Sequence, residues 1–140
     1  MTNDEITIWA AGFFDGEGCI SIGKPSGPKS THYRMTVKVA QKIDTPLKVL
    51  QRYWGGSLWC DERYGSWQWQ VCGENASNFL MDVLPYLIVK RKHAKLAISF
   101  QSRREIQGRH VANPVRHRKR DEADYAAMRI LNKPKFSSVT

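Results

Sequence analysis

Two acidic residues, Asp15 and Glu17, follow a long apolar stretch and are the side chains of this sequence best suited to do chemistry. Thr2 and Glu5 have the spacing of a capping box, which predicts a helix that begins there and continues to about Asp15. A helix C-terminus has unpaired carbonyl groups and partial negative charge, so it disfavours anions. Two carboxylates there require a cation, and oxygen ligands suit a hard ion such as Mg²⁺. A turn with two exposed acids is the alternative, and the residue types alone leave both open.

Gly12 and Gly16 stand four residues apart in the same predicted helix, so they share one of its faces. Because they have no side chains, a second backbone can approach that face closely. The rest of the helix is apolar almost all round, which predicts that it is buried or lies in an interface.

The surrounding segments predict an α+β domain. Apolar and polar residues alternate in four segments, which predicts strands over residues 19–24, 32–43, 57–61 and 67–72. Helical spacing predicts further helices over residues 44–54, 74–84, 88–107 and 121–131, the last one capped by Asp121 after a basic loop over 109–119. The order is αββαββα with additional C-terminal helices. We expect a single domain over residues 1–132 and a flexible tail over 133–140.

Basic residues are concentrated in the second half of the chain. Its 140 residues include 22 Lys and Arg against 13 Asp and Glu, for a formal charge of +9. Residues 1–85 hold 8 basic and 9 acidic side chains, whereas residues 86–140 hold 14 and 4. Such a block favours a polyanion, most often nucleic acid, because each neutralised phosphate releases counterions. A merely soluble basic face is the alternative, and a membrane surface ranks third.

The composition argues against several other classes of protein. The cysteines, Cys19, Cys60 and Cys72, are odd in number and lack C-x-x-C spacing, so we expect reduced thiols and no zinc site. No apolar run approaches the ~20 residues needed to cross a bilayer, and the acidic start of the chain lacks the basic region of a secretory signal. We therefore expect a soluble, intracellular protein without a membrane partner.

Residues 9–20, with the sequence WAAGFFDGEGCI, resemble the signature of the LAGLIDADG homing endonucleases. The order of elements behind this signature is similar to theirs, so the resemblance covers about residues 5–107. Two positions depart from the usual pattern: Ala10 stands where the family has Leu, and Glu17 stands where Asp is common. The resemblance implies a four-stranded antiparallel, saddle-shaped sheet that binds DNA. It also implies a site-specific, metal-dependent DNA endonuclease active in intron homing.

The same resemblance implies roles for individual residues. Glu17 would bind the metal together with the carbonyl of Gly16, and Asp15 matches the first acidic position and is a further candidate ligand. Mg²⁺ is the expected ion, and Mn²⁺ or Ca²⁺ could replace it. Gln41 matches a polar residue that orders water, and Lys90 matches a basic residue beside the scissile phosphate. Period-two counting independently places Gln41 at the edge of the core, where an ordinary end-of-strand glutamine is the alternative.

Cleaving both strands of double-stranded DNA requires two sites, and this chain has one motif. We therefore expect a homodimer whose motif helices cross through Ala11, Gly12 and Gly16, acting on an approximately palindromic duplex. The outward face of the sheet is expected to enter the major groove. Expected DNA contacts are Ser21, His32, Arg34, Thr36, Lys38, Gln68 and Gln70, with Lys92 as a neighbouring cation. The pattern does not decide which face Trp59 and Trp67 occupy.

Residues 90–120 hold 11 basic side chains and one acid outside the predicted sheet. We expect several of them, including Arg103 and Arg104, to contact flanking phosphates, which gives affinity without sequence information. A solvated basic face is the alternative for these residues.

Two other functions remain open. One is a catalytically inactive nucleic-acid-binding protein of the same fold, either an intron-RNA splicing helper or a DNA-binding regulator. The other is a generic basic RNA-binding module. The residues Asp15, Glu17, Gln41 and Lys90 favour the enzyme, because a pure binder has no need for carboxylates that face phosphate.

Overall fold

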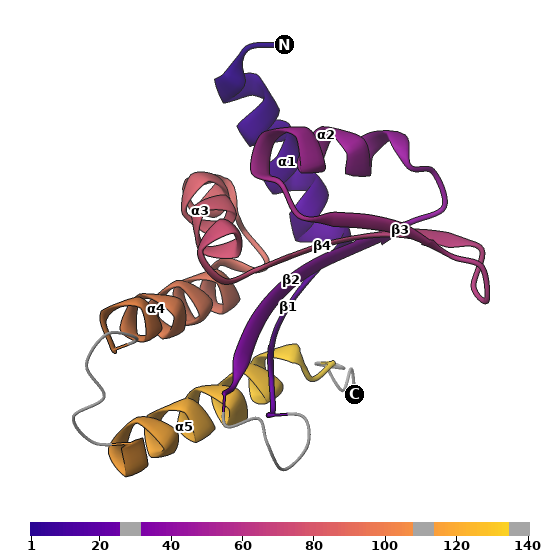
Figure 1. Ribbon diagram of the computed structural model, residues 1–140. Helices are drawn as coiled ribbons and strands as arrows, with labels where there is room; N and C mark the ends of the chain where they lie inside the picture. The colour runs from indigo at the N-terminus through magenta and orange to yellow at the C-terminus, as the bar shows by residue number, and fades with distance from the viewer. Residues whose placement is uncertain (26–31, 108–113, 135–140) are drawn as a thin grey trace, which may run out of the picture.

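The computed structural model describes residues 1–25, 32–107 and 114–134, and its elements follow the predicted order (Figure 1). Their bounds are α1 Asn3–Glu17, β1 Gly18–Gly23, β2 Arg34–Gln41, α2 Thr45–Trp54, β3 Ser57–Asp61, β4 Ser66–Cys72, α3 Gly73–Val83, the 3-10 helix η1 Leu84–Tyr86, α4 Arg91–Gln107 and α5 Pro114–Asn132. The αββαββα succession and the two further helices are therefore confirmed. None of the helices described is both long and apolar enough to cross a membrane.

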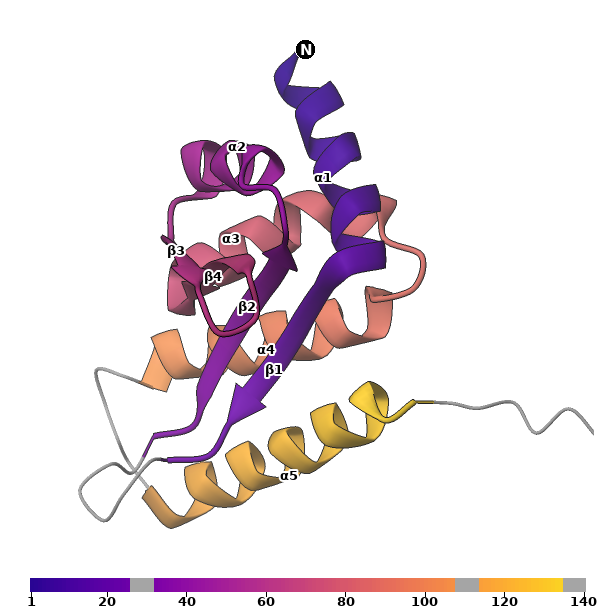
Figure 2. The ribbon, with the colours of Figure 1, turned by 90° about the vertical axis from the view of Figure 1, so that its right-hand side faces the viewer.

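The four strands form one antiparallel sheet in the order β1-β2-β4-β3. Helices α1, α3 and α4 lie on one face of the sheet (Figure 1), and α5 runs along the edge strand β1 (Figure 2). Asn132 ties the end of α5 to that edge, because its side-chain Nδ2 donates to the carbonyl of Ile20 at 2.8 Å. No helix in the described part of the chain covers the opposite face, which we call the bare face (Figure 2).

The core lies between the sheet and the helices. Along β2 the odd-numbered residues from Met35 to Val39 are buried, while the residues between them are half-buried or exposed. Phe79 of α3 lies at the centre of the core, and its ring makes edge contacts with Phe14 and Trp69 at centroid separations of 5.1 and 5.3 Å. The position of α1 on the sheet is therefore set by aromatic packing near its C-terminus.

Helix α1 begins with the predicted capping box. Thr2 Oγ1 accepts from the backbone N–H of Glu5 at 3.1 Å, and Glu5 Oε1 accepts from the backbone N–H of Thr2 at 2.8 Å. The hydrogen bonds from Thr2 lower the pKa of Glu5 below its usual value. The helix continues through Asp15 to Glu17, so both acidic residues of the motif belong to its last turn.

Gly18 is the residue at which α1 becomes β1. A Cβ at this position would lie 2.2 Å from ring atoms of Phe14. The Phe14 side chain is fully buried and packs against Phe79, so it cannot swing aside. The helix can pass directly into the strand because residue 18 has no side chain.

Two helix starts differ from the sequence prediction. Helix α4 begins at Arg91 rather than at residue 88, because the backbone over 88–90 bends before the helix. Helix α5 begins at Pro114, inside the predicted loop, and proline is favoured at the first helical position. Asp121 therefore lies within the helix instead of capping it, and its carboxylate is 3.8 Å from the guanidinium of Arg103. Residues 109–113 of the predicted loop lie outside the described residues.

Arg103 and Arg104 fasten the C-terminal helices to the domain. Arg103 of α4 donates to the carboxylate of Asp124 in α5, and its side chain is only 18% exposed. Arg104 donates to the backbone carbonyl of Tyr33, just before β2. The charge of Arg103 is thus already paired inside the protein, which does not favour the expectation that it binds a flanking phosphate.

We expect Gly18→Ala to lower the free energy of unfolding by about 1–3 kcal/mol, the usual cost of overpacking a filled core. Gly23→Ala in the same strand is the matched control, because the nearest atom to a Cβ there, the carbonyl oxygen of Arg34, is 3.8 Å away. In urea unfolding, the control should stay within about 0.5 kcal/mol of the unsubstituted protein. Equal losses in the two variants would contradict the role given to Gly18.

Candidate functional site

Asp15 joins the last turn of α1 to the segment that precedes α4. Its Oδ2 accepts the backbone N–H of Ile88 at 2.6 Å, and its Oδ1 accepts those of Val89 and Lys90 at 3.1 and 3.0 Å. These donors lie 73 to 75 residues away in the sequence. Both carboxylate oxygens of Asp15 are therefore engaged by peptide groups, which does not favour the expectation that this side chain binds a metal.

Lys90 brings its ammonium group to the same turn. Its Nζ donates to the backbone carbonyl of Asp15 at 2.7 Å, and the residue is half-buried. The structure thus places Lys90 directly beside the acidic end of α1. Lys92, the neighbouring candidate, is exposed in the first turn of α4.

Glu17 is the last residue of α1, and it is exposed. The final carbonyl groups of a helix have no helical partner. The carbonyl of Asp15 accepts a hydrogen bond from the Lys90 ammonium. The carbonyl of Gly16 belongs to the residue just before Glu17. A carboxylate and a carbonyl are the donors that Mg²⁺ prefers. No group of three His, Cys, Asp or Glu side chains is gathered for a metal among the residues described.

Gln41 is the last residue of β2 and is half-buried. It pairs with Trp67 of β4. Because Gly18 pairs with Val39, two residues earlier in β2, Gln41 lies at the end of the sheet where α1 enters β1. The structure therefore brings Gln41 to the same end of the domain as the acidic turn.

The strand register arranges polar side chains in rows across the bare face. Ser21 pairs with Thr36, which pairs with Cys72, and Lys38 pairs with Gln70. Alternate residues of a strand point to opposite faces, and the buried residues point to the helices. The predicted DNA contacts within the strands all alternate with buried residues: Ser21, Arg34, Thr36, Lys38, Gln68 and Gln70. His32, just before β2, is also exposed.

The register also decides where the two tryptophans face. Trp67 stands two residues before the buried Trp69, so it shares the helix-covered face. Trp59 pairs with Gln68 and lies on the bare face, where it is 36% exposed. The Nζ of Lys38 is 5.6 Å from the centre of the Trp59 ring. The bare face thus has an apolar ring beside its polar rows.

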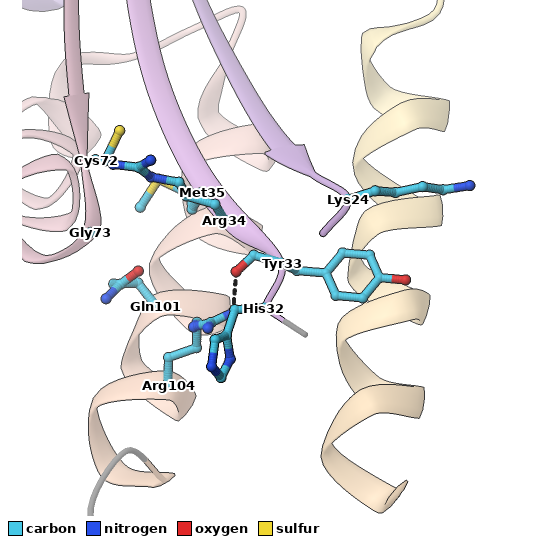
Figure 3. A pocket seen from close by; sticks show the side chains of 9 residues that line it. All are labelled: Lys24, His32, Tyr33, Arg34, Met35, Cys72, Gly73, Gln101 and Arg104. Atoms are coloured by element: carbon cyan, nitrogen blue, oxygen red, sulfur yellow. Dashed lines mark hydrogen bonds between the residues drawn. The ribbon is translucent and has the colours of Figure 1, made fainter. Parts of the chain in front are cut away.

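A hollow of about 530 Å³ lies at the start of β2, between this end of the sheet and α4 (Figure 3). Arg104 lies on its α4 side and donates to the carbonyl of Tyr33, as the dashed line in Figure 3 shows. The lining residues are Lys24, His32, Tyr33, Arg34, Met35, Cys72, Gly73, Gln101 and Arg104. None of these lining residues is acidic, so the hollow is a basic surface at the opposite end of β2 from Gln41.

Gly12 and Gly16 leave an open strip along α1. A Cβ at either position would meet no atom within 4 Å. Ile8, one turn before Gly12, is 50% exposed. Ala11 is fully buried against this chain's own core, which does not favour the expectation that it lies in an interface between two chains.

Sequence reasoning did not predict the partners of Asp15. Residues 88–90 are Ile, Val and Lys, so the start of α4 has no side chain of its own suited to cap it. The groups that bind Asp15 are backbone N–H groups of residues that precede the helix, and residue types do not reveal such contacts.

Comparison with known proteins gives a family match and several structural likenesses. A model of the LAGLIDADG endonuclease family matches residues 10–107. The homing endonuclease I-CvuI, in complex with its target in the presence of calcium, has a TM-score of 0.79 and 23% identity, over 97% of this chain and 87% of that one. The archaeal intron-encoded homing endonuclease I-Vdi141I, complexed with DNA, has a TM-score of 0.81 and 15% identity, over 99% and 91% of the two chains. The comparison with curated proteins finds no match.

These likenesses confirm the predicted α+β fold with its four-stranded antiparallel sheet. The family match spans well over half of the chain and includes the acidic turn, Gln41 and Lys90. As the motif predicted, the chain belongs to the LAGLIDADG endonuclease family, a family of homing endonucleases that act on DNA.

Proposed function

We propose that this chain is a metal-dependent, site-specific endonuclease that cleaves both strands of a long, approximately palindromic DNA duplex as a homodimer. The observation that carries the proposal is the arrangement at the end of α1. There the Lys90 ammonium is held 2.7 Å from the Asp15 carbonyl, in the same last turn that contains Gly16 and the exposed Glu17. Oxygen donors next to a fixed cation are suited to hydrolysis of a phosphodiester.

Glu17 and Gly16 are the groups that would hold Mg²⁺, with Mn²⁺ or Ca²⁺ able to take its place. When bound, a divalent ion neutralises phosphate oxygens and stabilises the leaving 3′ oxygen. The DNA complexes of I-CvuI obtained with calcium and with magnesium support this choice of ion. Because one chain supplies few ligands, phosphate oxygens, water and the second copy of the chain would complete the coordination shell.

Lys90 and Gln41 would act on the phosphate and on the attacking water. The ammonium of Lys90 stabilises the negative charge that develops on the phosphate oxygens, and it is already held in place before DNA binds. The amide of Gln41, at the end of β2, orients the water that attacks phosphorus. The attacking water then loses its proton to the solvent.

The bare face of the sheet would read the DNA sequence from the major groove, which admits a two-stranded β-ribbon. Arg34 and Lys38 suit guanine, and Gln68 and Gln70 suit adenine. Trp59, beside Lys38, offers an apolar surface for a thymine methyl group or a sugar. The basic hollow at the start of β2 suits backbone phosphates, which contribute affinity without specificity.

The homodimer is supported by the two open glycines of α1. A glycine in a helix interior costs about 1 kcal/mol relative to alanine. The space around Gly12 and Gly16 in this chain would accept a methyl group, so the chain's own packing does not require glycine there. Close approach of a second α1 would require glycine at both positions. A two-fold pair of chains would then bring one acidic turn to each DNA strand.

Glu17→Gln should abolish cleavage while DNA binding persists. Outer-shell changes typically cost about 10–100-fold in activity, so loss of a direct ligand should cost more than about 100-fold. The substrate is a plasmid carrying the sequences that flank the gene, joined without it, incubated with Mg²⁺ or with EDTA. Glu74→Gln, an exposed acid of α3, is the control and should cleave normally.

Cleavage by the Glu17→Gln protein at an unchanged rate would exclude the proposed site. If the unsubstituted protein binds this DNA but leaves it intact with Mg²⁺, the chain is a binding protein of the same fold instead.

Gly12→Leu should convert the dimer to a monomer, because four extra carbon atoms would separate the crossing helices. Sedimentation measures the mass, and circular dichroism checks that the variant is folded. Ala123→Leu, on the exposed surface of α5, adds a side chain to a helix without touching the open strip and should leave the dimer intact. A dimeric Gly12→Leu protein, or an unsubstituted protein that is monomeric on DNA, would contradict the interface.

A further inference from the structure

The segment over residues 88–90 has little hydrophobic packing to hold it. Ile88 is 86% exposed and Val89 is 68% exposed. The buried residues nearest to it in the sequence are Leu87, just before the segment, and Ala94, near the start of α4. Burial of its own side chains therefore cannot fix the path of the backbone over these three residues.

The carboxylate of Asp15 supplies the missing constraint. It accepts three consecutive backbone N–H groups, those of residues 88, 89 and 90, at 2.6 to 3.1 Å. Hydrogen bonds to an ionised carboxylate are roughly twice as strong as those between neutral groups. These N–H groups directly precede Arg91, so a side chain of α1 holds the segment that leads into α4.

This arrangement also explains why an acid is tolerated at the end of α1. A carboxylate near a helix C-terminus is disfavoured, but one near a helix N-terminus is favoured. Asp15 is both in the last turn of α1 and next to the N-terminus of α4, which offsets the unfavourable interaction.

The backbone carbonyl of Asp15 holds the other end of Lys90. It accepts the Nζ of that side chain at 2.7 Å, while the carboxylate accepts its backbone N–H at 3.0 Å. One residue thus fixes both the main chain and the ammonium group of Lys90.

We propose that Asp15 is a positioning residue that sets the location of Lys90 relative to Glu17, and that it is not a metal ligand. This inference rests on the proposed nuclease function for its catalytic consequence. Its structural part, the dependence of residues 88–90 on the Asp15 carboxylate, can be measured without any DNA.

The first experiment measures amide hydrogen exchange by NMR in Asp15→Asn and in Asp44→Asn. Asp44 precedes α2 and pairs with Lys48 at 3.0 Å, so its variant removes a carboxylate beside a different helix start. Exchange at residues 88–90 should become at least about tenfold faster in Asp15→Asn, as expected when hydrogen bonds to a charged group are lost. It should not change in Asp44→Asn. Unchanged exchange at 88–90 in Asp15→Asn would overturn the proposal.

The second experiment is a double-mutant cycle on the single-turnover cleavage rate, with Asp15→Asn, Lys90→Met and both changes together. Asp15→Asn should slow cleavage about 10–100-fold, the range for residues that act through another group. It should have little further effect in the Lys90→Met protein, because Asp15 acts through Lys90. Raising the Mn²⁺ concentration should not restore the rate.

Two results would overturn the positioning role. Restoration of the Asp15→Asn rate by Mn²⁺ would identify Asp15 as a metal ligand, and additive losses in the double variant would show that it acts independently of Lys90. Absence of cleavage by the unsubstituted protein would instead reject the nuclease function, and the exchange measurement would still decide the structural part.

Discussion

The arrangement of the candidate site depends on the hydrogen bonds that Asp15 accepts from the segment that precedes α4. They connect two segments 73 to 75 residues apart, one of which carries Glu17 and the other Lys90. Each segment alone would be poorly defined, because α1 ends in an exposed turn and residues 88 and 89 are exposed. Together they place an acid and a cation at one corner of the domain, next to the end of the sheet that carries Gln41.

The glycines of the motif are needed for different physical reasons. Gly18 is required by the chain itself, because a Cβ there would collide with the buried Phe14 ring. Gly12 and Gly16 have open space around them, so this chain's packing leaves them free to be replaced. A single short motif thus combines a glycine that the domain's own packing requires with two glycines that this packing does not require.

Much of the fold could be predicted from local patterns. The capping box of Thr2 and Glu5, the alternation along β2 and the hairpin of β3 and β4 are all properties of neighbouring residues, and each prediction is confirmed. The start of α5 was predicted too late because Asp121 has the residue type of a cap. Its actual role, an ion pair with Arg103, depends on how α4 and α5 pack, and no local pattern records that.

The candidate site shows the same division between local and long-range information. Its residue types and their positions in the chain were visible in the sequence, and so was the resemblance that connected them. The engagement of Asp15 by residues 88–90 was not visible, because backbone N–H groups leave no trace in residue type. Similarly, the burial of Ala11 and the opposite facing of Trp59 and Trp67 follow from tertiary packing and strand register.

Anomalous diffraction from a crystal of the protein with its duplex and Mn²⁺ would test the central claim most directly. We expect a manganese peak in contact with the Glu17 carboxylate, the Gly16 carbonyl and a backbone phosphate, with the Lys90 ammonium next to that phosphate and Asp15 still bonded to residues 88–90. A peak bound by Asp15, or a complex in which no manganese lies near Glu17, would contradict the assignment of this turn as the cleavage site.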